Sequence, residues 1–225
     1  MGGMSGRRQA AVGAFAVVAL WLIGFFLSGK PPKFDDPPAT VVDYYSSHHK
    51  QVLIAVILVA IGIAIFLVVI SQLSLYLRGA GQRSLAPVIL VAGSAMMGLF
   101  AVGDALYGVI AQAVAAPGAD PGLAKALYML DQFAGIPIYW ISLLLFGSVM
   151  LAANRGVFPR WALWFTGLLS VLAILGGLSV KADGAFAAGT GPFATVGFAA
   201  ALVFLLEVGV LLWTSPEPGT RMNGA

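Results

Sequence analysis

The sequence predicts an all-α, polytopic membrane protein with six transmembrane helices in one bundle. Hydrophobic residues make up 60% of the 225 residues and charged residues only 9%, which leaves too little polar surface to cover a water-soluble globule. A hydrocarbon core of about 30 Å requires roughly 20 helical residues per span. We therefore expect one membrane domain over residues 1–225. Its six apolar segments are residues 9–27, 50–77, 86–115, 123–152, 158–180 and 193–213.

The first segment, residues 9–27, is interpreted as a retained transmembrane helix. Arg7 and Arg8 precede it, as basic residues precede the apolar part of a signal peptide. The segment is longer than such an apolar part, however, and it lacks a small-x-small cleavage site before Lys30. We therefore count it as the first of the six spans.

Residues 30–49 form an outer loop that is expected to contain a short amphipathic helix. Its stretch PATVVDYYSSHHK leads into the second span. Asp36 is suited to cap this helix, with Pro37 in the first turn. Tyr44 and Tyr45 are expected to anchor the helix at the membrane interface, where tyrosine is enriched.

Two histidines, His48 and His49, end the same stretch. Asp43 is the nearest further ligand for a metal, but a spacing of five or six residues does not place it beside either histidine on a helix. We expect both histidines to be solvated at the interface, with metal binding or pH sensing as the alternatives. Neither a metal nor another cofactor is expected.

The third and fourth segments form a hairpin with a mirrored pair of motifs. The stretch DALYGVIAQAVAAPGADPGLAKALYMLD contains Asp104 and Tyr107 before the turn, and Tyr128 and Asp131 after it. At a rise of 1.5 Å per residue, each aspartate lies roughly 12 to 17 Å below the outer end of its helix, close to the bilayer midplane. Each tyrosine lies one turn nearer the outer surface. The four side chains are therefore expected at matching depths.

These four residues are the main candidate site. A central aspartate opposes membrane insertion by about 2.5 to 3.5 kcal/mol, so both carboxyl groups should face the bundle. We expect the tyrosine hydroxyls to donate to the carboxyl groups, and at least one aspartate to hold a proton, because no basic residue lies at membrane depth. The cluster is either a proton or cation relay or a neutral hydrogen-bonded clamp between the two helices.

Pro137 interrupts the fourth segment. Proline removes a backbone donor, so we expect a kinked helix with exposed carbonyl groups near Phe133. Such kinks line cavities in transporters but also occur in passive bundles.

The link between the fourth and fifth segments carries a resemblance to known proteins. The stretch LAANRGVFPRWALWFTGLL, residues 151–169, resembles a family of small bacterial six-span integral membrane proteins in which Arg-Gly-x-x-Pro-Arg-Trp recurs. The stretch DDPPATVVDYYSSHHKQVLIA has a similar character. The resemblance implies the same fold class and a bacterial membrane, and it implies no activity.

Glu207 is a third buried acid, in the last segment. It lies roughly 10 Å from the cytoplasmic end at 1.5 Å per residue. It should point into the bundle, because lipid offers no partner for its proton. Four polar residues lie near its depth and are candidate partners: Ser71, Gln72, Ser94 and Thr166.

The basic residues divide between the two sides of this topology. Short loops rich in arginine or lysine stay in the cytoplasm. One side has seven basic residues, several of them in short loops, and the other has five. Both termini lie on the side with seven and are therefore expected in the cytoplasm. The arginine side has Arg7, Arg8, Arg78, Arg83, Arg155, Arg160 and Arg221, and the lysine side has Lys30, Lys33, Lys50, Lys125 and Lys181.

Two functions are consistent with these features. One is a binding or structural role in the bacterial cytoplasmic membrane, with lipids or other membrane proteins as partners. The other is a proton-coupled transporter or channel that uses Asp104, Asp131 and Glu207. No nucleophile and base pair indicates an enzyme, and the net charge of +3 lacks the basic stripe that nucleic-acid binding requires.

Overall fold

The protein is a bundle of six helical spans, as the sequence predicts. A computed structural model describes residues 6–116, 118–181 and 183–216, and it contains six helical segments long and apolar enough to cross a membrane. The described residues form no β-strand beyond an isolated bridge between Lys181 and Ala187. The spans are α1 (Gly6–Ser28), α3 (His49–Gly79), α4 (Leu85–Ala115), α5 (Pro121–Ala134) with α6 (Ile136–Asn154), α7 (Arg160–Gly177) and α8 (Pro192–Thr214).

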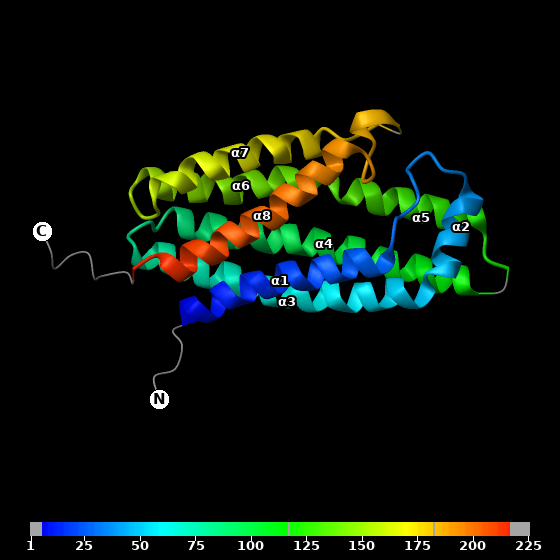
Figure 1. Cartoon of the computed structure of the whole chain (residues 1–225), viewed down its shortest axis with the longest axis horizontal. Helices are drawn as coiled ribbons and strands as arrows, with labels where there is room; N and C mark the ends of the chain where they lie inside the picture. Colours follow the sequence, from blue (N-terminus) through cyan, green and yellow to red (C-terminus); the bar gives the residue numbers. More distant parts are fainter. Residues whose placement is uncertain (1–5, 117, 182, 217–225) are drawn as a thin grey trace, which may run out of the picture.

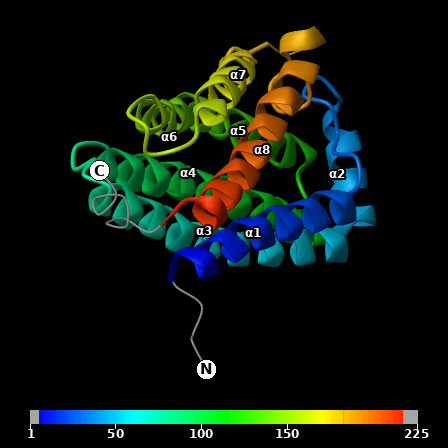
Figure 2. The same cartoon turned by 60° about the vertical axis from the view of Figure 1, so that its left-hand side comes forward.

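The spans pack as two helix pairs joined by further contacts. Helices α1 and α3 lie side by side, as do α6 and α7, while α8 runs obliquely between α1 and α7 (Figures 1 and 2). Helix α4 contacts both α3 and α6, which closes the bundle. The start of α1 and the end of α8 lie at the same end of the molecule.

Close helix approach depends on small residues. Gly176 of α7 and Gly197 of α8 face each other so tightly that a Cβ added to Gly176 would lie 2.9 Å from the Cα of Gly197. Gly62 of α3 likewise leaves room for the indole ring of Trp21, whose Nε1 donates to the carbonyl of Val59 at 3.3 Å. Small residues at such contacts are typical of helices packed in lipid, where apolar burial alone does not drive association.

The fourth span is interrupted near Pro137, where the proline kink is expected. Helix α5 ends at Ala134 and α6 begins at Ile136, so the break falls at Gly135. Pro137 occupies the first turn of α6, where a missing N–H costs no helical hydrogen bond. Gly135 keeps a helical backbone, with φ −71° and ψ −25°, and Pro121–Asn154 remains one span that is interrupted two residues before its proline.

A short helix, α2 (Pro38–Ser47), follows the loop after α1 and lies crosswise over the end of α4 and the start of α5 (Figure 1). Asp36 does not cap it, which corrects the prediction: Pro37 takes the cap position without a side-chain hydrogen bond. The carboxyl group of Asp36 instead accepts from the backbone N–H of Lys33 at 2.7 Å. The acid therefore stabilises the turn that precedes the helix.

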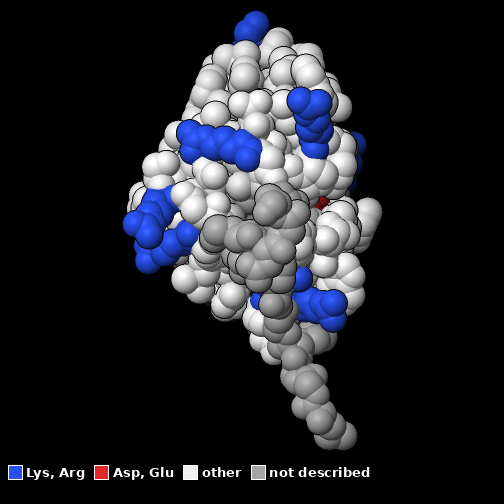
Figure 3. All heavy atoms as spheres, turned by 90° about the vertical axis from the view of Figure 1, so that its left-hand side faces the viewer, with Lys and Arg blue, Asp and Glu red and all other residues white. Residues whose placement is uncertain are grey.

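The two ends of the bundle differ in charge. The described arginines all lie at or beside the helix ends on the side where α1 begins and α8 ends. Figure 3 looks at this end, and basic side chains are visible on several sides of it with almost no acidic atom. Arg221 lies outside the described residues. The five lysines lie at or near the opposite helix ends.

Candidate functional site

Asp104, Tyr107 and Asp131 line one cavity of about 170 Å³ between α3, α4, α5 and α6. The remaining lining residues lack a polar side chain: Val59, Leu99, Phe100, Gly103, Gly135 and Ile138. The mirrored motif therefore brings both aspartates to a common space. The break at Gly135 lies in its wall, where the backbone approaches closely because glycine has no side chain.

Asp131 reaches across from α5 to the backbone of α4. Its Oδ1 lies 3.1 Å from the position that a Cβ on Gly103 would take. Its Oδ2 accepts a hydrogen bond of 2.9 Å from Nε2 of Gln132. The carboxyl group is therefore held beside the residue that precedes Asp104 in the chain.

Asp104 is half-buried and has no hydrogen-bond partner among the described residues. No basic side chain lines the cavity either. The two carboxyl groups thus share a mostly apolar space with a single neutral amide as their protein donor. A carboxylate in such surroundings needs a proton, a cation or water as partner.

The tyrosine hydroxyls do not donate to the carboxyl groups, and that prediction was wrong. The Tyr107 hydroxyl lies 2.7 Å from the hydroxyl of Tyr44 in α2, which in turn donates to the carbonyl of Ser28 at 2.7 Å. The Tyr128 hydroxyl donates to the carbonyl of Pro32. Both hydroxyls find partners in the segment from the end of α1 through α2, because this segment folds back over the outer end of the hairpin.

Tyr44 and Tyr45 are buried in the protein, so they are not the lipid-exposed anchors that the sequence predicts. Tyr45 is 0% exposed, and its ring centroid lies 5.2 Å from that of Tyr107 and 6.4 Å from that of Tyr128. Burial raises the pKa of both the Tyr44 and the Tyr45 hydroxyl above its usual range, so both stay protonated at neutral pH. Tyr44, Tyr45, Tyr107 and Tyr128 form the outer tyrosine cluster.

A signal for this cluster exists in the sequence. Val41, Tyr44 and Tyr45 follow a spacing of three and four residues, and all three are buried on one face of α2. That spacing predicts an apolar helix face. In the structure this face packs on α4 and α5.

The loop before α2 is also fixed to α5. Nζ of Lys125 donates to the carbonyl of Phe34 and lies 5.7 Å from the centroid of the Phe34 ring. Together with the bond from Tyr128 to Pro32, this contact holds the loop against the outer end of the hairpin. The loop and α2 therefore cover the outer side of the tyrosine cluster.

Glu207 lies in the core, away from the cavity residues. It is 3% exposed, and its Oε1 accepts a hydrogen bond of 2.7 Å from the hydroxyl of Thr166 in α7. Its Oε2 has no partner among the described residues. The expectation that Glu207 points into the bundle is met. Of its candidate partners Thr166 is the one it contacts, since Ser71 donates to the carbonyl of Leu67 and Ser94 is exposed.

His48 and His49 do not form a metal site in the structure. His48 stacks on Tyr44 with ring centroids 5.0 Å apart, and its Nδ1 lies 2.9 Å from the hydroxyl of Ser47. The Nε2 of His49 is buried without a partner in the described part of the chain, so this histidine is less solvated than expected. Among the residues described, no group of three or more His, Asp or Glu side chains could hold a metal ion.

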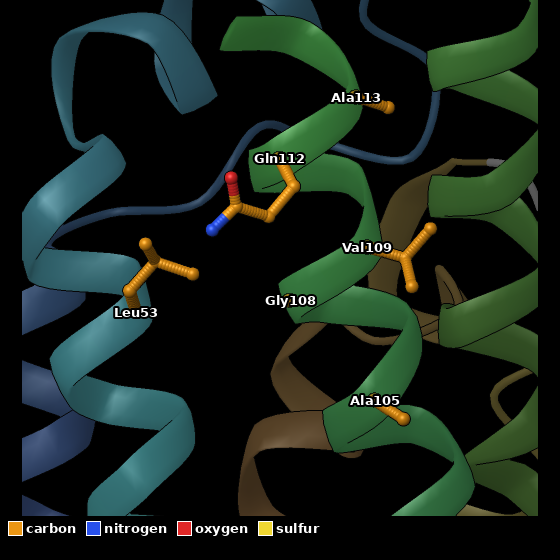
Figure 4. Close-up of a pocket in the computed structure, with 6 residues that line it drawn as sticks. All are labelled: Leu53, Ala105, Gly108, Val109, Gln112 and Ala113. Atoms are coloured by element: carbon orange, nitrogen blue, oxygen red, sulfur yellow. The ribbon is translucent and has the colours of Figure 1, made fainter.

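A second concave surface lies between α3 and α4 (Figure 4). It is a shallow groove lined by Leu53 of α3 and by a small-residue face of α4. Gln112 turns its amide toward Leu53 and is the sole polar side chain of the lining. The groove has no titratable side chain, whereas the aspartate cavity has two carboxyl groups.

Comparison with family models, curated proteins and solved structures gives no match to this chain.

Proposed function

We propose that the protein is a membrane carrier that takes up and releases protons or small cations at Asp104 and Asp131. The observation that supports this proposal is the cavity of about 170 Å³ that both carboxyl groups line without a basic partner. Acids inside a membrane protein are costly, and unpaired ones are typical of ion pathways. The fourth span is interrupted at Gly135, in the cavity wall and two residues before Pro137, and proline-interrupted helices also line cavities in transporters.

The change in hydrogen bonding of the tyrosines favours this function over a neutral clamp. A clamp requires that the carboxyl groups satisfy each other or the tyrosines, yet the hydroxyls of Tyr107 and Tyr128 bond elsewhere. Asp104 has no protein partner among the described residues. Its partner is then an exchangeable species in the cavity.

The membrane and its orientation are part of the proposal. We assign the protein to the bacterial cytoplasmic membrane with both termini in the cytoplasm, because the arginine-rich helix ends gather on the side where α1 begins. The aspartate cavity and the tyrosine cluster then lie toward the outer half of the bundle. Glu207 is an inner acid that a proton could reach after the cavity.

Proton flux tests the proposal. Purified protein in liposomes with an internal pH-sensitive dye should dissipate an imposed pH gradient faster than empty liposomes. Asp104→Asn combined with Asp131→Asn should abolish that flux, because an amide does not exchange a proton at neutral pH. Asp43→Asn, at an exposed position of α2, is the matched control and should leave the flux unchanged.

A binding or structural role is the second candidate. The neutral donor that Gln132 offers to Asp131, and the bond between Thr166 and Glu207, both fix helices to one another. This role predicts no flux in any variant and a lower unfolding temperature for the aspartate double variant. The two functions therefore give opposite results in the same pair of measurements.

A further inference from the structure

The direction of two hydrogen bonds determines what the aspartate cavity offers to a ligand. A carbonyl oxygen can accept a hydrogen bond and cannot donate one, so Tyr44 donates its single hydroxyl proton to the carbonyl of Ser28. The bond of 2.7 Å between Tyr44 and Tyr107 must then have Tyr107 as donor. Tyr107 consequently has no proton left to donate into the cavity.

The other polar groups of the lining are acceptors as well. Both aspartates present carboxyl oxygens, and Oδ1 of Asp131 has no hydrogen-bond partner in the described chain. The backbone N–H of Gly135 is already used, because it donates to the carbonyl of Asp131. In their ionised form these groups make a lining with acceptors and no free donor.

We infer that the cavity binds a small ammonium-type cation that donates several N–H hydrogen bonds, such as ammonium or a primary amine. The inference rests on the proposed function and names the ligand class for the same site. It does not depend on negative charge alone, since the donor direction at Tyr107 is fixed by Tyr44 and Ser28. A quaternary ammonium such as tetramethylammonium would match the charge of the site and donate no hydrogen bond to its acceptors.

The size and the walls of the cavity set the upper limit on this ligand. The cavity has a volume of about 170 Å³. A water molecule takes about 30 Å³ of liquid volume, and a drug-sized ligand needs roughly 300 Å³ or more. The cavity is therefore larger than one water molecule and smaller than a drug-sized ligand requires. Val59, Leu99 and Ile138 provide apolar contacts for a short alkyl group. Phe100 and Tyr107 are the aromatic residues of the lining, and an ammonium group is stabilised near an aromatic ring.

Tyr44 is a positioning residue in this site. It does not line the cavity, and it acts through the orientation of the Tyr107 hydroxyl. Without the Tyr44 oxygen, the Tyr107 proton is free to turn toward the cavity. It would then compete with the N–H groups of a bound amine for the carboxyl oxygens.

The test compares methylammonium with tetramethylammonium by isothermal titration calorimetry on the whole chain in lipid nanodiscs. The two probes have the same charge, but only methylammonium has N–H donors. The unaltered protein should bind methylammonium at least about tenfold more tightly, since each added hydrogen bond to a charged group contributes more than a neutral one. Tyr44→Phe should reduce this ratio severalfold by weakening methylammonium binding alone.

Tyr45→Phe is the matched control, because the Tyr45 hydroxyl lies in the same cluster and has no partner within the described structure. It should leave the ratio unchanged. Tyr107→Phe removes an acceptor without adding a donor, so it should also lower the ratio, and it replaces Tyr44→Phe if that variant does not fold.

The outcomes separate this inference from the proposed function. Equal affinity for the two probes, or a ratio that neither tyrosine variant changes, overturns the assignment of an ammonium ligand. If the aspartate double variant still loses proton flux in that case, the carrier proposal stands. If the double variant changes neither flux nor probe binding, the carrier proposal fails together with the inference.

Discussion

The hydroxyl oxygens of Tyr44 and Tyr107 lie 2.7 Å apart, and they join a helix outside the six spans to the wall of a cavity among them. Tyr44 belongs to α2, and Tyr107 lies three residues beyond Asp104 on α4. The contact depends on the return of the chain after α1, because Ser28 at the end of that helix accepts the Tyr44 proton. Three segments that are distant in sequence thus fix one hydroxyl.

Single cysteines should reveal the orientation of the bundle. The chain has no native cysteine, so Ser46→Cys in α2 and Ser84→Cys before α4, both at exposed positions, can be labelled separately. We expect an impermeant thiol reagent added to intact cells to label Ser46→Cys and to leave Ser84→Cys unlabelled until the membrane is permeabilised. The reverse pattern would invert the proposed topology.

Gly189→Ala should disturb the cavity from the loop after α7. A Cβ at this glycine would overlap Oε1 of Gln132, whose Nε2 holds Asp131. The φ of +68° also disfavours alanine, at a cost of roughly 1–2 kcal/mol. We expect lower thermal stability and, through loss of the Gln132 donor, altered flux or cation binding.

Gly184→Ala is the control for that variant. Gly184 has a similar φ of +72°, but no atom lies within 4 Å of its added Cβ. It should reproduce the loss of stability without the change in flux. If both variants alter flux equally, Gln132 does not position Asp131.

Thr166→Val should destabilise the contact between α7 and α8. It keeps the shape of the side chain and removes the donor to Oε1 of Glu207, which would leave a buried carboxyl group without a partner among the described residues. A cost of about 1–3 kcal/mol in the free energy of unfolding is expected. Adding Glu207→Met should recover most of the loss, because replacing both partners by apolar groups removes the unsatisfied acceptor. Unfolding in detergent measures both variants, and an unchanged Thr166→Val would show that the bond contributes little.

Two tyrosines of the outer cluster should respond in opposite ways to loss of their hydroxyl. Tyr45→Phe removes a buried hydroxyl that has no partner in the described chain, so stability should stay the same or rise. Tyr128→Phe leaves the carbonyl of Pro32 without its donor and should cost about 1 kcal/mol. The unfolding temperatures of the two variants in the same detergent give the comparison, and an equal loss in both would contradict the hydrogen-bond assignments.

Apolar length and residue spacing are enough to predict which segments span the membrane and how deep their polar residues lie. Apolar length decides the spans, since about 20 residues are needed to cross the hydrocarbon core, and the predicted bounds differ from the observed helix ends by at most three residues. A turn centred near residues 117 and 118 predicts matching depths for Asp104 and Asp131, and the structure brings both to one cavity. The cost of a carboxyl group in lipid likewise pointed Glu207 inward.

The groups that these side chains contact depend on how the helices and loops pack together. Depth along a helix follows from a fixed rise per residue, whereas the partner of a hydroxyl depends on helix rotation and on segments that return from elsewhere in the chain. The fold-back of α2 gave Tyr107 a partner in Tyr44, and the loop before it gave Tyr128 a partner in Pro32, so neither tyrosine was left for an aspartate. The spacing of apolar residues does not predict that α2 folds back onto α4 and α5. Its apolar face is equally suited to lipid and to the tyrosine cluster.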